Sequence, residues 1–271
     1  MITVNHLSYA YQGSKRKVFD DFSLTLQGNG IYGLLGKNGT GKSTLLYLIS
    51  GLLRPGEGTV SIDGDTSFTR KPEMLADIFL VPEEFEMPEI SLRQFVKINS
   101  VFYPHFSNNL LEECLSDFDV DPGANLRNLS MGQKKKVFMS YALATNTRLI
   151  LMDEPTNGLD IPSKSLFRKV VASHIDENRT LIISTHQVHD IENLLDHIII
   201  IDGNSVLLDS PTGDITSHYA FRTIPATEAA TAIYAEPSMG GLNAMLKREE
   251  GGPETQINLE LLFNAAISQK L

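Results

Sequence analysis

The segment GIYGLLGKNGTGKSTLLYLIS, residues 30–50, carries the strongest structural signal in the chain, because an apolar strand pattern leads through a glycine-rich loop into an apolar helix. Its centre fits the pattern G-x-x-x-x-G-K-[ST], in which backbone N–H groups turn inward around a phosphate and the following helix adds the positive end of its dipole. A flexible glycine turn is the plain alternative, but the flanking strand and helix favour a phosphate site. The predicted phosphate-binding residues are Gly36, Lys37, Asn38, Gly39, Thr40, Gly41, Lys42, Ser43 and Thr44.

Two side chains of this loop predict a nucleotide that carries β- and γ-phosphates as the ligand. Lys42 is placed to reach the β- and γ-phosphates and to take part in their chemistry, and Ser43 can hold Mg²⁺ through its hydroxyl.

A pair of acids supplies the second half of the expected site. Asp153 and Glu154 follow the apolar strand LILM, residues 149–152, and ligands of open α/β sheets gather at the carboxyl ends of strands. We therefore predict Asp153 as a Mg²⁺ ligand and Glu154 as the base for an attacking water. Adjacent acids can also be ordinary loop residues that cap the next helix, and this alternative is weaker beside a phosphate loop.

The remaining sequence predicts an α/β fold with a central, mostly parallel sheet flanked by helices. Strand patterns at 2–11 and 18–27 precede the phosphate loop and indicate an N-terminal β-subdomain. Apolar residues at helical spacing in 92–103 and 108–118 indicate a helical subdomain at about residues 84–128. Beyond it, helix and strand patterns alternate; the segments are 134–144, 148–155, 162–175, 180–185, 190–196 and 197–202.

Composition narrows the classes of function. The chain has 271 residues, of which 42% are hydrophobic, enough for one large domain with a subdomain. Its 23 Lys and Arg against 33 Asp and Glu disfavour nucleic acid and anionic membranes as partners. Cys114 alone cannot form an internal disulfide and is expected to be buried. We see no leader pattern and no run long enough to span a bilayer, so we expect a cytoplasmic protein.

Five stretches in this order resemble the ATP-binding subunits of ABC transporters, particularly those of exporters. They are GKNGTGKST (36–44), LSMGQ (129–133), LILMDEP (149–155), GLD (158–160) and STH (184–186), which are similar to the Walker A, signature, Walker B, D-loop and switch-histidine motifs. The resemblance covers about residues 1–215 and implies a P-loop NTPase fold of the ABC ATPase type, with an antiparallel N-terminal β-subdomain. Residues 216–271 remain as a small C-terminal extension, with a loop at 248–255 and an amphipathic end at 258–269.

The resemblance also implies roles for single residues. Tyr11 matches the aromatic residue that stacks on adenine, with Tyr9 as its rival and two structural tyrosines as the alternative. His186 matches the catalytic histidine that contacts the γ-phosphate and orders the water with Glu154. Asp160 matches the residue that links the two sites of a dimer. In the family each site is shared, so the signature residues would face ATP held by a partner subunit; they are Ser130, Gly132 and Gln133.

The chain departs from the family pattern at two positions. Met131 stands where a second glycine is usual, and its side chain could narrow the approach to phosphate or point away. Glu83 stands where the family has a glutamine, and a carboxylate offers no donor to water. We predict Glu83 as a metal ligand that alters the Mg²⁺ dependence; the alternative is a Glu83 turned to solvent.

The signature is followed by the triplet Lys134, Lys135 and Lys136. Three successive helical positions span about 200°, so these side chains cannot all face one phosphate. We expect most of them to be solvated, with at most one near the partner's nucleotide.

The function implied by the resemblance is ATP hydrolysis that drives transport through a separate multi-span membrane protein, at the cytoplasmic face of the membrane. The expected partners are a second ATP-binding subunit, identical or related, which ATP would hold in a dimer, and that membrane protein, docked at residues 84–128; no nucleic acid is expected. FYPHF, residues 102–106, resembles exporter ATPases. Two alternatives stay open, a soluble ABC ATPase acting on ribosomes or DNA and a nucleotide-dependent regulator with low turnover.

Overall fold

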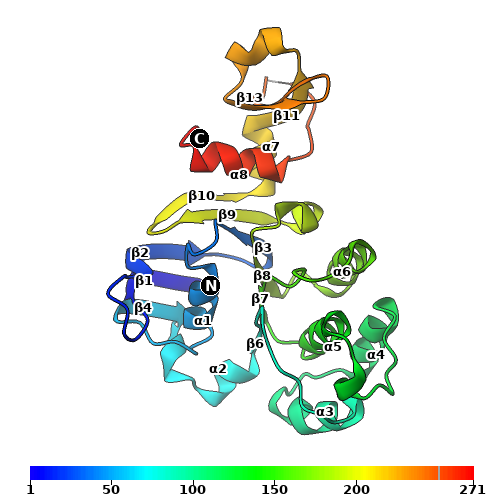
Figure 1. The fold of residues 1–271 in the computed structure, drawn as a ribbon. Coiled ribbons are helices and arrows are strands. Elements are labelled where there is room, and N and C mark those ends of the chain that lie inside the picture. Colours follow the sequence, from blue (N-terminus) through cyan, green and yellow to red (C-terminus); the bar gives the residue numbers. More distant parts are fainter. Residues whose placement is uncertain (250) are drawn as a thin grey trace.

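The computed structural model describes residues 1–249 and 251–271. Glu250, inside the loop predicted at 248–255, lies outside the described residues. Over the described ranges the strands form three sheets, with helices packed around the central one (Figure 1).

The central sheet has the predicted, mostly parallel arrangement. Its order is β10-β9-β3-β8-β7-β6, and every neighbouring pair is parallel except β10 with β9. Because parallel strands end at the same edge, the loops after β3, β7 and β8 meet there. The strands are β3 (Gly30–Leu35), β6 (Ile78–Val81), β7 (Leu149–Asp153), β8 (Thr180–Thr185), β9 (His197–Asp202) and β10 (Ser205–Pro211).

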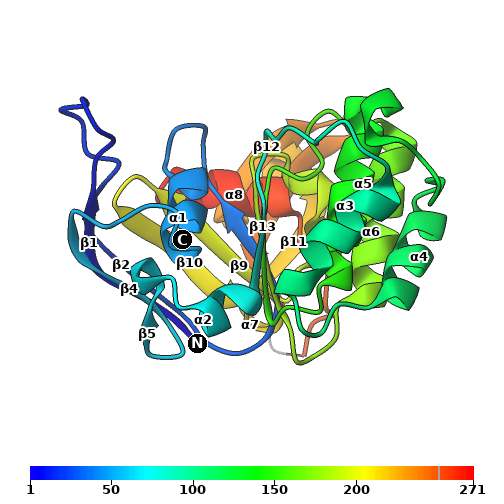
Figure 2. The same cartoon turned by 90° about the horizontal axis from the view of Figure 1, so that it is seen from below.

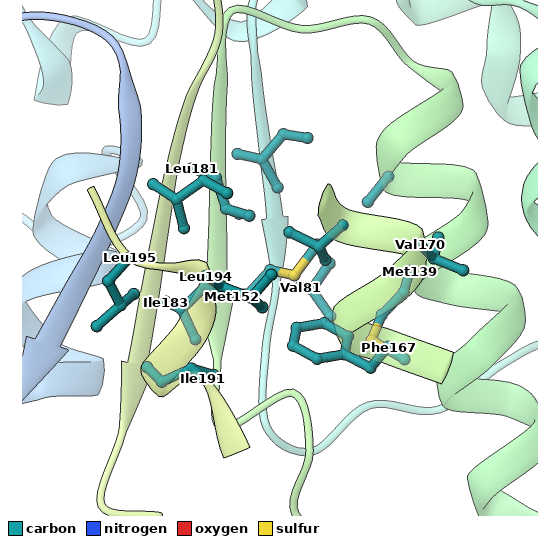
Figure 3. Packing of buried hydrophobic residues seen from close by; sticks show 14 of the residues in the cluster. Val81, Met139, Met152, Phe167, Val170, Leu181, Ile183, Ile191, Leu194 and Leu195 are labelled. Carbon is teal, nitrogen blue, oxygen red and sulfur yellow. The ribbon is translucent and has the colours of Figure 1, made fainter. Parts of the chain in front are cut away.

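Alternating side chains of this sheet enter two separate cores. On β7, Ile150 and Met152 pack toward α5 and α6, whereas Leu149 and Leu151 pack toward α1 and the N-terminal sheet. Figure 2 shows the two layers on opposite sides of the sheet, and Figure 3 shows Met152 close to Phe167 of α6. Both faces are covered, which is why the interior positions of these strands are apolar, such as residues 149–152 of β7 and 198–201 of β9. The covering helices are α1 (Lys42–Ile49), α5 (Met131–Ala144) and α6 (Ile161–His174).

The N-terminal part confirms the predicted antiparallel β-subdomain. Its sheet has the order β2-β1-β4-β5, with β1 paired to both β2 and β4 in antiparallel register. The elements are β1 (Ile2–Tyr9), β2 (Phe19–Leu26), β4 (Glu57–Ile62), β5 (Asp65–Thr66) and the short helix α2 (Pro72–Ala76).

Two helices precede α5 in the region predicted to be helical. Ser91 and Gln94 form a capping box at the start of α3 (Leu92–Asn99), and Ser107 caps α4 (Asn108–Asp117). Cys114 is fully buried in this layer, as predicted, and burial raises the pKa of its thiol to about 12.

The C-terminal part contains more structure than the sequence suggested. Its antiparallel sheet has the order β11-β13-β12, and the predicted division near residue 215 falls within α7. The elements are α7 (Thr212–His218), β11 (Tyr219–Ile224), β12 (Tyr234–Ser238), β13 (Gly241–Lys247) and α8 (Leu259–Ile267).

Helix α8 is fastened to the segment that follows β8. The Leu259 N–H donates to Glu192 Oε1 at 2.6 Å, and Glu260 Oε2 lies 2.8 Å from His189 Nε2. The helix predicted at 190–196 is wrong, because this segment forms two short 3₁₀ turns, Val188–Asp190 and Glu192–Leu194. Through His189 and Glu192 these turns hold the start of α8.

No helix in the part of the chain that the structure describes has both the length and the apolar character needed to cross a bilayer.

Candidate functional site

The glycine loop joins β3 to α1 in a conformation that requires glycine at two positions. A Cβ at Gly36 would come within 2.6 Å of Thr40 Oγ1 and 2.8 Å of the Ile201 carbonyl oxygen. Gly41 has φ 101°, and a Cβ there would lie 2.6 Å from Phe19. The backbone is therefore tightly curled, which leaves its N–H groups free to surround an anion.

Lys42 begins α1 and is buried over this loop. Its amine donates to the carbonyl oxygens of Gly36 at 2.8 Å and Lys37 at 3.2 Å, and lies 4.0 Å from Glu154 Oε1. Burial lowers the pKa of Lys42, while the charges of Glu154, Asp153 and Glu83 act in the opposite direction. The loop and the acids thus face one another across a single cavity.

This cavity has a volume of about 560 Å³ and brings together most of the predicted residues. Its walls come from the glycine loop, from the ends of β6, β7 and β8, and from the segment after β1. The lining residues are Tyr11, Val18, Asn38, Gly39, Gly41, Lys42, Ser43, Thr44, Glu83, Glu154, Asn157 and His186.

Asp153 lies at the end of β7 and presents one unused oxygen. Ser184 Oγ donates to its Oδ1 at 2.5 Å, whereas its buried Oδ2 has no hydrogen-bond partner among the described residues. Burial raises the pKa of Asp153, and the hydroxyls of Ser184 and Ser43 work against that rise. A buried carboxylate oxygen without a donor, beside a hydroxyl, fits Mg²⁺, which takes few protein ligands and completes its shell with water and phosphate.

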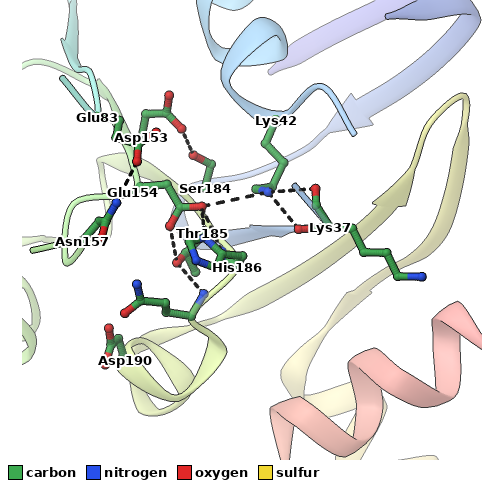
Figure 4. Close-up of polar contacts among 12 residues, drawn as sticks. Lys37, Lys42, Glu83, Asp153, Glu154, Asn157, Ser184, Thr185, His186 and Asp190 are labelled. Carbon is green, nitrogen blue, oxygen red and sulfur yellow. Dashed lines mark hydrogen bonds and ion pairs between the residues drawn. The ribbon is translucent and has the colours of Figure 1, made fainter. Parts of the chain in front are cut away.

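Glu154 is held on both carboxylate oxygens by residues that follow β8 (Figure 4). Its Oε1 accepts from the His186 backbone N–H at 3.0 Å and lies 2.7 Å from His186 Nδ1, and its Oε2 accepts from Thr185 Oγ1 at 2.8 Å. Its φ is 44°, a left-handed conformation that is costly outside glycine. A carboxylate fixed in this way beside a histidine is equipped to orient and deprotonate a water.

Glu83 follows β6 and turns into the cavity. Its Oε1 accepts from Asn157 Nδ2 at 2.8 Å, and its side chain is among those lining the space between the loop and Glu154. This contact and this placement favour an inward Glu83 over the alternative of a side chain turned to solvent. Metal binding by Glu83 stays a prediction.

Tyr11 also lines the cavity, and its neighbour Tyr9 does not. The Tyr11 hydroxyl lies 2.9 Å from Thr44 Oγ1, and the two tyrosine rings meet edge to face with centroids 5.1 Å apart. Tyr11 is 43% exposed, so one part of the ring remains available for stacking.

The signature residues lie away from this cavity. Ser130 is the N-cap of α5 and forms a capping box with Gln133, and Met131 is 57% exposed. A Cβ at Gly132 would meet only Leu159, at 3.8 Å. Asp160 caps α6 by accepting from the Ser163 N–H at 2.9 Å. The start of α5 is therefore open on the surface, where a second molecule could approach it.

One member of the lysine triplet differs from expectation. Lys134 and Lys136 are partly exposed, but Lys135 is buried, and its amine donates to the Asn157 carbonyl oxygen at 2.7 Å. Lys135 thus turns toward the chain's own cavity and not toward a partner. Helical periodicity could have signalled it, because the positions four and seven residues on, Met139 and Ala142, are buried on the same face of α5.

Sequence reasoning missed four polar residues that organise the acids. Asn157 could have been suspected from its place between Glu154 and Asp160. Ser184 and Thr185 look like ordinary strand residues, and only the pairing of β7 with β8 brings them to the acids. Lys135 is the fourth.

Known proteins resemble the chain in sequence and in fold. The ABC transporter family matches residues 19–157. The ABC transporter ATP-binding protein YtrB of Bacillus subtilis is 31% identical over 208 residues, 76% of this chain and 70% of that protein. The ABC transporter ATP-binding protein NatA of the same organism is 30% identical over 216 residues, 76% of this chain and 88% of that protein. A solved dimeric ATP-binding cassette in a post-hydrolysis state, bound to ADP and phosphate, shares the fold with a TM-score of 0.67 at 22% identity, over 78% of this chain and 98% of that one.

Proposed function

The chain belongs to the ABC transporter family and is one of its ATP-binding, ATP-hydrolysing domains, and on that premise we propose that it powers a membrane transporter as a dimer. The observation that carries the proposal is the separation between the cavity and the signature. Ser130, Gly132 and Gln133 line no part of the chain's own cavity, so a second copy or a related subunit is needed to bring a signature to the phosphates. The N-terminus of α5 offers free N–H groups and a positive dipole end for that purpose.

Within one chain the residues divide the work of hydrolysis. The glycine loop and Lys42 bind the phosphates, and Tyr11 supports the adenine. Glu154 takes a proton from the attacking water, while His186 and Thr185 hold the carboxylate in place. Mg²⁺, held by Ser43 and Asp153 with Glu83 beside them, would neutralise charge on the phosphates.

A second surface suits the membrane partner. Aromatic side chains of β6, α3 and α5 border a groove of about 300 Å³ that includes the 67% exposed Phe102, and the Tyr141 hydroxyl has no hydrogen-bond partner among the described residues. Glu86 lines the groove, and the exposed Glu84 and Glu89 are its neighbours in the sequence. We assign this groove to a cytoplasmic segment of a multi-span membrane protein that carries apolar side chains and a basic residue. On that assignment the chain would work at the cytoplasmic face of the membrane. The exporter-like segment FYPHF lies beside the groove and favours export as the direction.

Co-purification tests this assignment. Tagged wild type, extracted from membranes of its own host with mild detergent, should bring down a multi-span membrane protein, and the pair should hydrolyse ATP and move substrate in proteoliposomes. Phe102→Asp should lose the membrane protein while keeping its ATPase rate. Phe68→Asp is the matched control, since Phe68 is 38% exposed on a different subdomain, and it should keep both. A wild type that remains in the membrane-free fraction, or a Phe102→Asp variant that binds normally, would overturn the proposal and favour the ribosome- or DNA-directed alternative.

A further inference from the structure

Lys135 is a buried lysine that belongs to neither the glycine loop nor the signature, and it has no role in the site described above. Its side chain is 7% exposed, and its amine donates to the Asn157 carbonyl oxygen at 2.7 Å. The Asn157 side-chain amide in turn donates to Glu83 Oε1 at 2.8 Å. Contacts therefore run from α5 through the segment after β7 to the residue that follows β6.

The charges around Lys135 are unbalanced without it. Burial lowers the pKa of Lys135, while the charges of Glu83, Glu154, Asp153 and Glu84 act in the opposite direction and favour its ammonium form. Lys42 is the other ammonium group facing these acids, and the β- and γ-phosphates claim it when ATP binds. Lys135 then remains as the chain's own counter-charge, in a site where low dielectric makes each unpaired charge expensive.

We propose that Lys135 is a positioning residue for ATP hydrolysis, which holds Asn157 so that its amide fixes Glu83 and which offsets the negative charge of Glu83. A glutamine at position 83 would need no such counter-charge, so the unusual acid and the buried lysine act as a pair. The proposal concerns hydrolysis alone and holds whether or not the chain works with a membrane protein.

A double-mutant cycle tests the pair. Lys135→Gln and Lys135→Met are each made in the wild-type chain and in Glu83→Gln, with Lys134→Gln as the control that removes a charge one position earlier on the same helix. In the wild-type background we expect Lys135→Gln to lower kcat about tenfold, with KM for ATP changed by less than about threefold. In the Glu83→Gln background the same change should cost less than about threefold in kcat.

Two outcomes would overturn the pairing. One is a Lys135→Gln variant that keeps the same kcat as Lys134→Gln. The other is an equal loss in both backgrounds, which is the behaviour of a lysine that merely supports the fold. Glutamine at position 135 retains a donor for the Asn157 carbonyl oxygen. If Lys135→Met does not fold, Lys135→Gln therefore still tests the role of the charge.

Discussion

At the scale of single residues, the acids of the site show what a sequence can and cannot reveal. Asp153 and Glu154 were predictable because they end an apolar strand in a chain that also has a glycine loop. No local pattern predicts the left-handed backbone of Glu154, with φ 44°. The groups that donate to its carboxylate are Thr185 and the His186 N–H, 31 and 32 residues later in the chain. The inward turn of Glu83 likewise depends on Asn157. Motifs therefore identify the reacting groups, and tertiary contacts determine their orientation.

Glu154→Gln should remove the base while leaving nucleotide binding intact. We expect the ATPase rate to fall at least about a hundredfold and an ATP-bound dimer to accumulate, since the chain can no longer hydrolyse what holds the dimer together. Phosphate release and size-exclusion chromatography with ATP measure the two effects. Glu84→Gln, at an exposed acid near the cavity, is the control. A variant that hydrolyses ATP within about twofold of wild type would point to another base, and an unchanged monomer would favour a nucleotide-dependent regulator.

Glu83→Gln should shift the dependence on Mg²⁺. If the carboxylate is a ligand, the Mg²⁺ concentration that gives half-maximal ATPase rate should rise severalfold when a neutral amide replaces it. ATPase rates are compared over a Mg²⁺ titration at fixed total ATP. Superimposable curves for variant and wild type would remove Glu83 from the metal site.

At the scale of secondary-structure elements, the success of prediction followed the environment of each element. The strands of the central sheet are buried on both faces and are therefore continuous apolar runs that a sequence displays plainly. The C-terminal sheet was missed because its strands are half-exposed and bordered or interrupted by Pro225 and Pro237. The helix predicted at 190–196 was wrong, because the segment forms 3₁₀ turns, in which Glu192 accepts from the Leu259 N–H of α8.

Asp117 joins α4 to α6 and makes the helical layer sensitive to acid. Its carboxylate lies 2.8 Å from Lys169 Nζ and 3.3 Å from His174 Nε2, and these contacts, Lys169 first, lower the pKa of Asp117. A lowered pKa in the folded state contributes stability above the unfolded pKa of 3.8, and that stability is lost as the pH falls through the folded pKa.

Asp117→Asn should therefore lower the free energy of unfolding by about 0.5–1 kcal/mol at pH 7. The difference from wild type should shrink as the pH falls below roughly 4, where the wild-type carboxylate takes up its proton. Urea unfolding at pH 7, 5 and 3 measures this, with the exposed and unpaired Asp119→Asn as control among the described residues. A difference that is the same at all three pH values would show that packing, not charge, explains the effect.

At the scale of the whole molecule, the layers of sheet and helices were predictable, but the order of the strands within the central sheet was not. The alternation of helices and strands implied a parallel sheet with covered faces, yet nothing local specified that β3 lies between β8 and β9. The outward placement of the signature also belongs to this scale, because it depends on how the helical layer sits against the sheet. If each site is shared between two subunits, two variants that are defective in different parts of the site should complement each other.

If the protein is a homodimer, two variants that are each inactive should regain ATPase activity when they are mixed and form dimers with each other. Lys42→Ala spoils the phosphate loop and keeps the signature, whereas Gly132→Asp spoils the signature and should fold, because a Cβ there meets only Leu159 at 3.8 Å. About half of the dimers in an equimolar mixture would be mixed, and each mixed dimer would carry one intact composite site out of two, so the mixture should reach about a quarter of the wild-type ATPase rate. A mixture no more active than the average of the two variants would contradict the shared site.

The position of β3 also has a consequence for how the protein is made. Gly30 aligns with Thr180 and Tyr32 with His197, so the strand that carries the phosphate loop must wait for partners encoded near the far end of the domain. At ribosomal speed this delay is on the order of ten seconds, during which the apolar strand has no edge to join. ATP cannot stabilise the nascent chain in that interval, because its binding loop has no fixed base. The protein must therefore complete its sheet before its ligand can contribute to folding, which makes early synthesis the stage at which it is most prone to aggregate.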